Sequence, residues 1–379
     1  MRVAWIITGF AKDESDLNGA PSIHNLAKEI SLLPGINLDI YSFYYPVNKS
    51  HYKYYNANVY GFAEEISISK ISKYFLWKKA VKKFTAEYKK EKYDLIHSLW
   101  AGESGNIASH LAKKFKIPFI AQVCGGELAQ IKDINYGSRL NFRQRLFINR
   151  SFKSADKIVI GSEFLRILVQ KYYGDLIYKK LVCIPFGVDE NKFYNKNTLN
   201  VQKNIKLINV ANAVPVKNHL MLVKAFKIVK EKYPDAELSV YGKDAEERID
   251  EISHYLNLNG SVHSMGFIDH NSLPDKLNAS DVFLLTSLYE AQNVSALEAA
   301  FCGVPVVGTN TGILPEITGN IVNSNDPADF ADGIIKVLGN LESEKIKSLG
   351  KINNLISEYS LKSVTAKFIK LYGELISKE

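Results

Sequence analysis

Short, mainly apolar runs alternate with longer amphipathic segments through the first half of the chain. Runs of this length are typical of buried strands, and apolar residues spaced three and four apart are typical of helices. Strands that alternate with helices form βαβ units, so the pattern predicts a parallel sheet covered by helices. The expected strands are Val3–Ile7, Leu38–Phe43, Leu95–Leu99, Pro118–Val123, Ile158–Ile160 and Leu181–Ile184, and the clearest helices are Ala20–Leu33, Gly105–Phe115 and Glu163–Tyr173.

The pattern is interrupted at Asp189–Gln202, a polar, asparagine-rich stretch that we interpret as a linker. Beyond it the alternation resumes, with expected strands Ile205–Val210, Glu237–Tyr241, Val282–Leu285 and Val304–Val307 and a helix Lys217–Lys232. The sequence therefore predicts an α/β protein with two Rossmann-like, doubly wound domains, residues 1–195 and 200–360. Ligands of such sheets bind beyond the carboxyl ends of the strands, so we expect the site in the loops there.

Composition narrows the class of protein. A chain of 379 residues, 46% hydrophobic and 23% charged, suits two ordinary globular domains. Val3–Ile7 is too short for the core of a signal peptide, and no stretch has the roughly 18 uninterrupted apolar residues of a membrane span. Cys124, Cys183 and Cys302 form neither a zinc motif nor a disulfide framework. We therefore expect a cytoplasmic protein.

The net charge of +8 is unevenly distributed. Residues 1–197 contain 30 Lys and Arg against 18 Asp and Glu, whereas the remainder contains 18 against 22. A basic first half indicates an anionic partner, which charge alone leaves open among nucleic acid, a membrane surface and a phosphorylated substrate.

Two carboxylates stand eight residues apart in Thr286–Gly303, TSLYEAQNVSALEAAFCG. Glu290 falls in a loop after a strand, while Asn293 and Val294 open a helix that carries Glu298. Free N–H groups at such a helix start, together with the helix dipole, favour a diphosphate. Glu298 is then suited to the hydroxyls of a ribose and Glu290 to those of a sugar. The alternative is that both glutamates merely complement the helix dipole.

The surrounding motifs resemble one known family. SDVFLLTSLYE, ALEAAFCGVPVVGTNTGILPEI, ADKIVIGSEF, IPFGVDENKFY and LINVANAVPVKNHLMLVKAF are similar to segments of retaining glycosyltransferases of the glycogen-synthase-like, family 4 type, which carry an E-x7-E motif. The resemblance implies the GT-B fold, in which two Rossmann-like domains face each other across a cleft. It also implies that the last helix, residues 361–379, packs back on the first domain.

The resemblance assigns roles in the second domain. It implies that Glu298 binds the ribose of the donor and Glu290 its sugar, and that Lys217 contacts the diphosphate and neutralises its charge. The family usually has an Arg five residues before this Lys, where the present chain has Asn212. Lys243, after VYG, is a candidate to supply the missing charge. The alternative for Lys217 is an ordinary solvated lysine at a helix start.

In the first domain the correspondence is weaker. The family's His-Gly pair is replaced in AQVCGGE, where Cys124 stands for the His and Gly125 follows. We interpret Cys124 as a packing residue, because nothing near it in sequence activates a thiol. Gly19, before the first helix, matches the loop that lies against the donor phosphates, or is an ordinary helix start. His97 is either an acceptor-side residue or a structural histidine.

The resemblance implies a retaining transfer from a UDP- or GDP-sugar to a glycan or lipid-linked acceptor, in surface polysaccharide or glycolipid synthesis. The chain has no Asp-x-Asp motif to hold a metal ion on the diphosphate, so we expect no cofactor and metal-independent transfer. Asn212 and Cys124 leave a non-catalytic nucleotide-sugar-binding subunit as an alternative. A nucleotide-sugar epimerase on the same fold is a further alternative, although such enzymes lack this glutamate spacing.

A basic amphipathic segment, residues 67–93, contains nine lysines and two glutamates, with aromatic residues at helical intervals. A second basic cluster covers residues 139–157. Such segments favour peripheral contact with an anionic membrane. The alternative is a helix that packs on its own sheet while its lysines stay in water. No nucleic-acid-binding motif accompanies the charge, so we expect no nucleic-acid partner.

Overall fold

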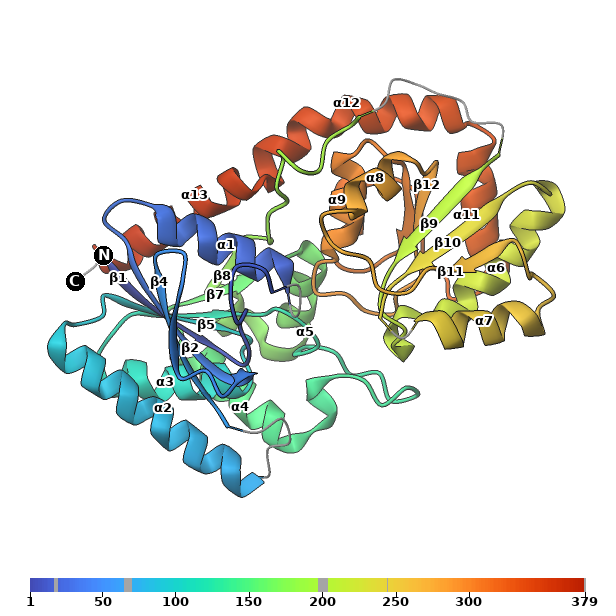
Figure 1. Cartoon of the computed structure of the whole chain (residues 1–379). Helices are drawn as coiled ribbons and strands as arrows, with labels where there is room; N and C mark the ends of the chain where they lie inside the picture. Colours follow the sequence, from blue (N-terminus) through green and yellow to red (C-terminus); the bar gives the residue numbers. More distant parts are fainter. Residues whose placement is uncertain (17–19, 65–69, 197–203, 244, 378–379) are drawn as a thin grey trace. The chain divides into compact units, whose positions relative to one another are not determined.

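The computed structural model describes residues 1–16, 20–64, 70–196, 204–243 and 245–377, which form two compact units (Figure 1). Unit 1 comprises Met1–Gly187 and Leu361–Glu379, and unit 2 comprises Val188–Ser360. The change of unit thus precedes the polar stretch that the sequence suggests as a linker. The physical reason is that Val188 N donates to Tyr359 O (2.9 Å) and Phe193 is buried in the core of unit 2.

The sheet of unit 1 has eight strands in the order β3-β4-β2-β1-β5-β6-β7-β8. Its described pairings are parallel, except that β3 runs antiparallel to β4. The strands are β1 (Arg2–Ile7), β2 (Asn37–Val47), β3 (His51–Tyr54), β4 (Ala57–Ala63), β5 (Leu95–Leu99), β6 (Phe119–Gln122), β7 (Lys157–Ile160) and β8 (Leu181–Cys183). The β3–β4 hairpin was not among the expected elements; β3 is only four residues long, and β4 has a glycine in its interior.

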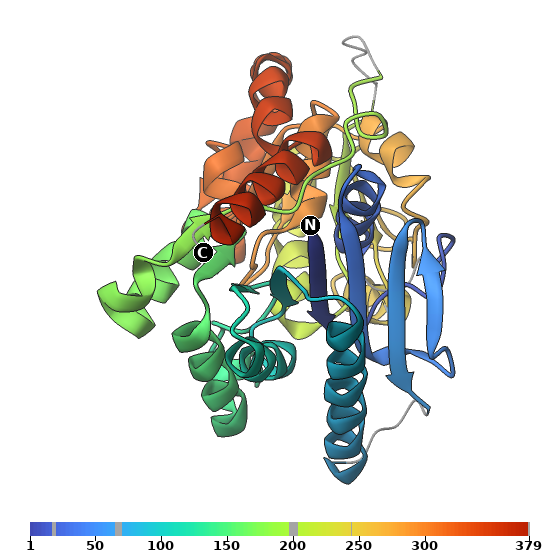
Figure 2. The same ribbon diagram turned by 90° about the vertical axis from the view of Figure 1, so that its left-hand side faces the viewer.

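Helices cover both faces of this sheet (Figures 1 and 2). α1 (Pro21–Leu32) and α13 (Leu361–Ile376) pack side by side on one face, and α2 (Lys70–Lys90), α3 (Glu103–Phe115) and α4 (Phe142–Ser154) on the other. α5 (Glu163–Tyr178) joins β7 to β8, and a short turn η1 (Ser138–Leu140) precedes α4. α13 is tied to β1 by a hydrogen bond from Trp5 Nε1 to the hydroxyl of Tyr372 (3.1 Å). The last helix therefore completes the core of unit 1.

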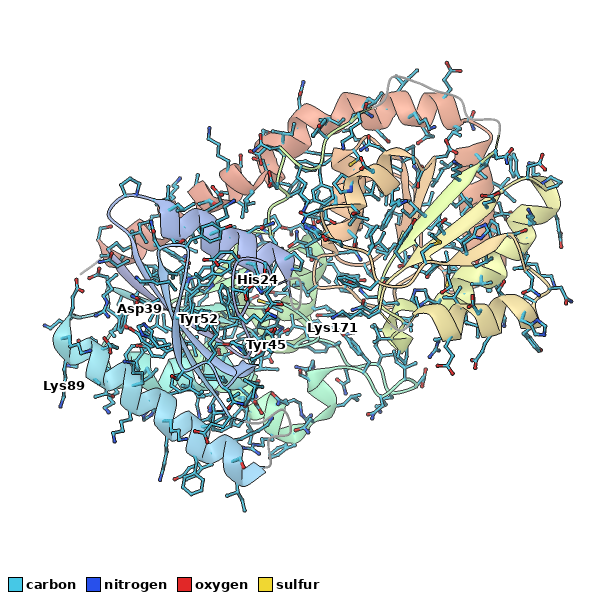
Figure 3. The ribbon with its side chains drawn as sticks, in the orientation of Figure 1. His24, Asp39, Tyr45, Tyr52, Lys89 and Lys171 are labelled. Atoms are coloured by element: carbon cyan, nitrogen blue, oxygen red, sulfur yellow. The ribbon has the colours of Figure 1, made fainter. Side chains whose placement is uncertain are left out.

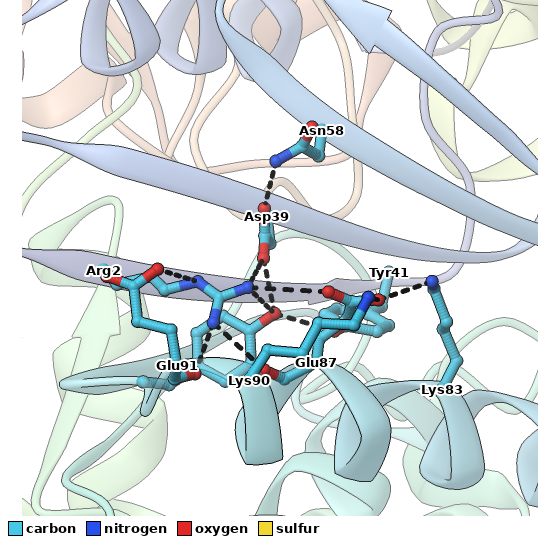
Figure 4. A network of polar contacts seen from close by, with 9 residues as sticks. Arg2, Asp39, Tyr41, Asn58, Lys83, Glu87, Lys90 and Glu91 are labelled. Atoms are coloured by element: carbon cyan, nitrogen blue, oxygen red, sulfur yellow. Dashed lines mark hydrogen bonds and ion pairs between the residues drawn. The ribbon is translucent and has the colours of Figure 1, made fainter.

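A buried polar network joins the first strand of unit 1 to α2 (Figure 4). Arg2 Nη2 lies 2.7 Å from Asp39 Oδ2 on β2, and Tyr93 donates to the same oxygen (2.5 Å). Arg2 also donates to the backbone carbonyls of Glu87 and Glu91 at the end of α2. Both charges of the Arg2–Asp39 pair are nearly inaccessible to water. The additional hydrogen bonds therefore offset the cost of removing these charges from water.

Unit 2 contains a six-stranded parallel sheet in the order β11-β10-β9-β12-β13-β14. The strands are β9 (Lys206–Val210), β10 (Glu237–Tyr241), β11 (Val262–Ser264), β12 (Val282–Leu285), β13 (Val306–Thr309) and β14 (Ile321–Val322). The helices are α6 (His219–Lys232), α7 (Ala245–Tyr255), α8 (Leu273–Asn278), α9 (Val294–Phe301), α10 (Leu314–Ile317), α11 (Pro327–Leu338) and α12 (Leu341–Tyr359), with a turn η2 (Pro215–Lys217) before α6.

Two apolar cores hold this sheet. Residues of α6, α7 and α11 form one cluster with the sheet, and residues of α8, α9 and α12 form the other. Parallel strands buried on both faces read as continuous apolar runs, which is why the sequence pattern predicted β9, β10, β12 and β13 but not the short edge strands β11 and β14. This arrangement leaves the two ends of the strands for binding loops.

Candidate functional site

The strand order of unit 2 reverses between β9 and β12. From β9 the chain crosses to β10 on one side, whereas β12 lies on the other side of β9. Ligands of open α/β sheets bind beyond the carboxyl ends of the strands at such a switch point. Lys217 follows β9, and Glu290 lies in the loop that joins β12 to α9. The two residues therefore flank this point.

Lys217 and Glu290 form an ion pair. Lys217 Nζ lies 2.6 Å from Glu290 Oε1, and the two side chains are 21% and 10% exposed. Their loops are joined directly, since Leu288 N donates to Val216 O (2.8 Å) and Thr286 Oγ1 donates to Lys217 O (2.9 Å). The fold thus brings together Lys217, expected at the diphosphate, and Glu290, expected at the sugar, which are the two residues for which we predict a catalytic role.

Two further side chains orient the Glu290 carboxylate. Ser287 Oγ donates to Oε1 (2.6 Å) and Asn293 Nδ2 donates to the same oxygen (3.0 Å). Ser287 is held in turn by Thr309 on β13, whose hydroxyl donates to its carbonyl (2.6 Å). Gly312 lies against the loop with φ +56°, and a Cβ there would stand 2.8 Å from Glu290 Cβ. One carboxylate oxygen of Glu290 is therefore rigidly held.

Asn293 is the N-cap of α9 and has a left-handed backbone conformation. Its φ of 73° is left-handed, which Asn tolerates better than most residues, and its side chain accepts from Ala296 N (2.8 Å). The N–H groups of Val294 and Ser295 have no acceptor within the helix, as at any helix start. Asn293 therefore contacts Glu290 while it leaves the first two amides of α9 for an anion.

Glu298 lies one turn into α9 and is almost completely buried. Its Oε1 accepts from His270 Nε2 (2.6 Å), in the segment after β11, and His270 Nδ1 lies 2.9 Å from Lys192 Nζ. Neither His270 nor Lys192 is among the residues that the sequence motifs predict. His270 is 28 residues from Glu298, and Lys192 is 78 residues from His270, so no local sequence pattern connects the three residues.

Asn212 and Lys243 lie at the ends of β9 and β10. Asn212 is exposed, and its Oδ1 accepts from Lys243 N (3.0 Å). Gly242, directly after β10, has φ +158°, and a Cβ would stand 2.0 Å from Ala211 O, so only glycine fits. The ammonium group of Lys243 lies 5.5 Å from the ring centroid of Phe267. Lys243 is thus at the correct sheet edge, and its role in donor binding stays a prediction.

A tight loop follows β6 in unit 1. The buried carboxylate of Glu127 accepts from the backbone N–H groups of Ala101 (3.2 Å), Cys124 (3.1 Å) and Gly125 (2.7 Å). Burial, together with this carboxylate, raises the pKa of the Cys124 thiol well above its ordinary value. Such a thiol is a poor nucleophile, so the geometry favours packing over chemistry for Cys124.

His97 requires a correction. The imidazole on β5 is fully buried, and its Nδ1 lies 2.7 Å from the hydroxyl of Tyr372 on α13. Trp5 and Phe368 pack against the ring, with centroids 5.7 and 5.6 Å away. Burial lowers the pKa of His97 to about 3. A side chain with no exposed surface cannot contact an acceptor, so His97 is a structural histidine.

Gly19 lies outside the described residues, but the loop that leads toward it is fixed. Tyr45 donates to Asp16 Oδ2 (2.7 Å), and Tyr52 donates to the carbonyl of Ala11. Figure 3 labels both tyrosines together with His24 on α1. The ring of Phe10 packs against His24 at 5.1 Å. The carboxyl end of β1 therefore continues into an anchored loop.

A groove of unit 1 runs along the basic helix α2. It has a volume of about 880 Å³ and lies between α2 and α3, with Arg150 of α4 at its border. Its wall includes the apolar or aromatic residues Tyr74, Trp77, Val81 and Ile107 and the cations Lys78, Lys82, Lys89, Lys114 and Arg150. Beyond the groove, Ile71, Phe75 and Phe142 are 72%, 56% and 67% exposed. Within the described residues, none of the helices has the length and apolar character required to cross a bilayer.

Known proteins resemble the chain in both sequence and structure. Residues 190–352, which contain the whole unit 2 site, match the family Glycosyl transferases group 1. The chain is a glycosyltransferase. It is 27% identical over 312 residues to the UDP-Gal:alpha-D-GlcNAc-diphosphoundecaprenol alpha-1,3-galactosyltransferase of Escherichia coli, covering 76% of this chain and 77% of that protein. It is 24% identical to the D-inositol 3-phosphate glycosyltransferase of Corynebacterium jeikeium, covering 75% and 73%.

Solved structures show the same fold. Sucrose-phosphate synthase from Thermosynechococcus elongatus superposes with a TM-score of 0.82 at 19% identity and full coverage of both chains. Anabaena HepE in complex with UDP and glucose superposes with a TM-score of 0.75 at 15% identity, covering 98% of this chain and 99% of that one. The predicted fold class, two Rossmann-like domains of the GT-B type, is confirmed, as is the predicted class of enzyme.

Proposed function

We propose that this glycosyltransferase moves a hexose from a UDP-sugar to a hydroxyl of a glycan or lipid-linked acceptor, with retention and without a metal ion. The observation that carries the proposal is the Lys217–Glu290 pair at the switch point, 2.6 Å apart and beside the start of α9. A cation, free helix amides and an oriented carboxylate are the groups that a nucleotide-sugar requires. UDP is preferred to GDP because the E. coli relative uses UDP-Gal and HepE binds UDP.

Each residue has a distinct part in this proposal. Lys217 and the amides of Val294 and Ser295 face the diphosphate and stabilise the negative charge that develops as its bond to the sugar breaks. Glu290 accepts hydrogen bonds from the hydroxyls of the sugar and fixes its orientation. Glu298 accepts from the ribose. Retention rests on the family resemblance, with departure and attack on the same face of the sugar.

A second proposal concerns the acceptor. The groove and the exposed apolar residues at the starts of α2 and α4 suit an anionic membrane surface, and the E. coli relative acts on a diphosphoundecaprenol-linked sugar. We infer that residues 70–93 and 139–157 hold unit 1 at the cytoplasmic face of a membrane; residues 67–69 of the first basic segment lie outside the described residues. A lipid-linked acceptor in polysaccharide or glycolipid synthesis follows from this placement.

The direct test is release of UDP from UDP-Gal, UDP-Glc and UDP-GlcNAc, measured with and without an undecaprenyl-diphosphate-linked GlcNAc acceptor. We expect acceptor-dependent release that persists in excess EDTA, and NMR of the product gives the anomeric configuration. Release that stops with EDTA contradicts metal independence, and an inverted product contradicts retention.

The alternative of a non-catalytic nucleotide-sugar-binding subunit has one supporting observation. Asn212 lacks the positive charge of an Arg and uses its carbonyl to hold Lys243 N. The same assay separates the two functions. Binding of UDP-sugars with no UDP release in the presence of acceptors favours the subunit, whereas any turnover that Lys217→Met abolishes favours the enzyme.

A further inference from the structure

Three side chains from separate segments of unit 2 form a continuous chain of hydrogen bonds that ends on Glu298. Lys192 Nζ lies 2.9 Å from His270 Nδ1, and His270 Nε2 lies 2.6 Å from Glu298 Oε1. Lys192 also donates to Asn271 Oδ1 (2.9 Å), which fixes the ammonium group from a second direction. The side chains of His270 and Glu298 are only 19% and 7% exposed.

The donors and acceptors of this chain have one consistent assignment. An ammonium group has three N–H donors and no acceptor, so His270 Nδ1 must accept from Lys192. The imidazole proton then resides on Nε2, which donates it to Glu298. Lys192 thereby selects the neutral tautomer of His270 with its proton toward the carboxylate. Phe193 packs on the imidazole, with ring centroids 5.1 Å apart, and limits its rotation.

This arrangement divides the two oxygens of Glu298 between different tasks. Oε1 is engaged by His270, while no described side chain or backbone amide donates to Oε2. A carboxylate with one oxygen fixed has its plane and its free lone pairs fixed as well. The two neighbouring hydroxyls of a ribose require such a fixed acceptor, because both must donate at the same time.

We propose that His270, held in one tautomer by Lys192, is a positioning residue for Glu298 and thus determines selectivity for a ribose-containing nucleotide. The inference rests on the proposed function, in which Glu298 binds the ribose. His270 itself does not contact the reacting atoms. Loss of His270 lowers the affinity for the donor, because the ribose is bound less tightly, and leaves the rate of the transfer step unchanged.

The test compares the affinity of the full chain for UDP and for 2′,3′-dideoxy-UDP by titration calorimetry. The wild-type protein is expected to bind UDP about tenfold more tightly, as hydrogen bonds to a charged acceptor require. His270→Ala and Glu298→Gln remove most of this preference, and they change binding of the dideoxy compound by less than about threefold. His270→Gln, whose amide can donate from the position of Nε2, retains the preference.

Lys192→Met gives an intermediate loss, because the imidazole remains but its tautomer is free. In steady-state assays, His270→Ala raises the KM for the UDP-sugar and changes kcat by less than about twofold. Equal weakening of UDP and dideoxy-UDP by His270→Ala, or no effect on either, overturns the positioning role even when Glu298→Gln abolishes the ribose preference. A wild-type protein that binds UDP and dideoxy-UDP equally overturns the assignment of Glu298, and the proposed ribose site with it.

Discussion

Lys217 Nζ lies 2.6 Å from Glu290 Oε1, so the cation assigned to the diphosphate and the carboxylate assigned to the sugar neutralise each other across the switch point of unit 2. Neither charge is exposed enough to be solvated freely. Ser287 and Asn293 hold the carboxylate from other directions, so it keeps its orientation when an anion competes for Lys217. In the proposed function, the pair thus places a cation at the diphosphate and an acceptor at the sugar, on either side of the bond that breaks.

Lys217→Met removes the charge that stabilises the leaving diphosphate. We expect kcat to fall about 100- to 1,000-fold, the usual effect of losing one preorganised group at a developing negative charge. Glu290→Gln keeps an acceptor for Lys217 but loses the charge, so a smaller loss of about tenfold is expected. The rate of UDP release at a saturating concentration of the UDP-sugar measures kcat for both variants. Lys224→Met, an exposed change on α6, is the matched control, and a similar loss in that variant would contradict the assignment.

Ile71→Asp combined with Phe75→Asp tests the membrane surface of unit 1. Each side chain contributes roughly 1.5–3 kcal/mol when it leaves water, so the double variant is expected to bind anionic vesicles at least tenfold more weakly. Co-sedimentation with vesicles of mixed neutral and anionic lipid measures the change. Leu176→Asp, which alters an equally exposed side chain on α5, provides the control. Binding that is unaffected by the double variant, or no wild-type binding at moderate salt, contradicts the membrane proposal.

Arg2→Met tests the buried network that joins β1, β2 and α2. Removing one partner leaves Asp39 buried without its cation, and we expect the free energy of unfolding to fall by about 3–5 kcal/mol. Lys79→Met breaks the exposed pair with Glu64, whose side chains are 57% and 73% exposed, and should cost less than about 1 kcal/mol. Urea unfolding followed by tryptophan fluorescence reports on both, because Trp5 lies in the core of unit 1. Equal losses in the two variants would show that the network does not act as a buried charge pair.

Three buried histidines make the protein sensitive to mild acid. Burial lowers the pKa of His97 to about 3 and of His24 and His219 to about 4, from an ordinary value of 6.5. Between pH 6.5 and 4 the unfolded chain binds these protons and the native state does not, so stability falls as the pH falls. Each histidine adds up to about 1.4 kcal/mol per pH unit to the slope.

His97→Gln isolates one of these protons. The free energy of unfolding is measured by urea titration at pH 7, 6 and 5. Its decrease with falling pH should be less steep in this variant, by up to about 1.4 kcal/mol per pH unit, because one fewer proton is bound on unfolding. An unchanged slope would mean that His97 binds protons equally in the native state and in the unfolded chain. That result would contradict its burial beside Tyr372.

The sequence predicted the features that depend on local pattern. Continuous apolar runs predicted most of the buried parallel strands, although β4, β11 and β14 were not expected, and the motifs around Glu290 and Glu298 led to the proposed donor site. Contacts between distant segments were not accessible in this way. His97 has the same polar side chain whether it faces a cleft or α13, and only the position of Tyr372 decides between them. His270 likewise acquires its partner Glu298 only when β11 and α9 are brought together.

The hydrogen bond between Trp5 and Tyr372 spans 367 residues and joins the first strand to the last helix. During synthesis, residues 188–360 of unit 2 emerge before α13, whereas β1 emerges first and can pair with α13 only after unit 2 has left the ribosome. Unit 2 can therefore fold as a contiguous segment while unit 1 is still incomplete. Removal of α13 would therefore damage unit 1, which contains β1, and spare unit 2, which holds Glu290.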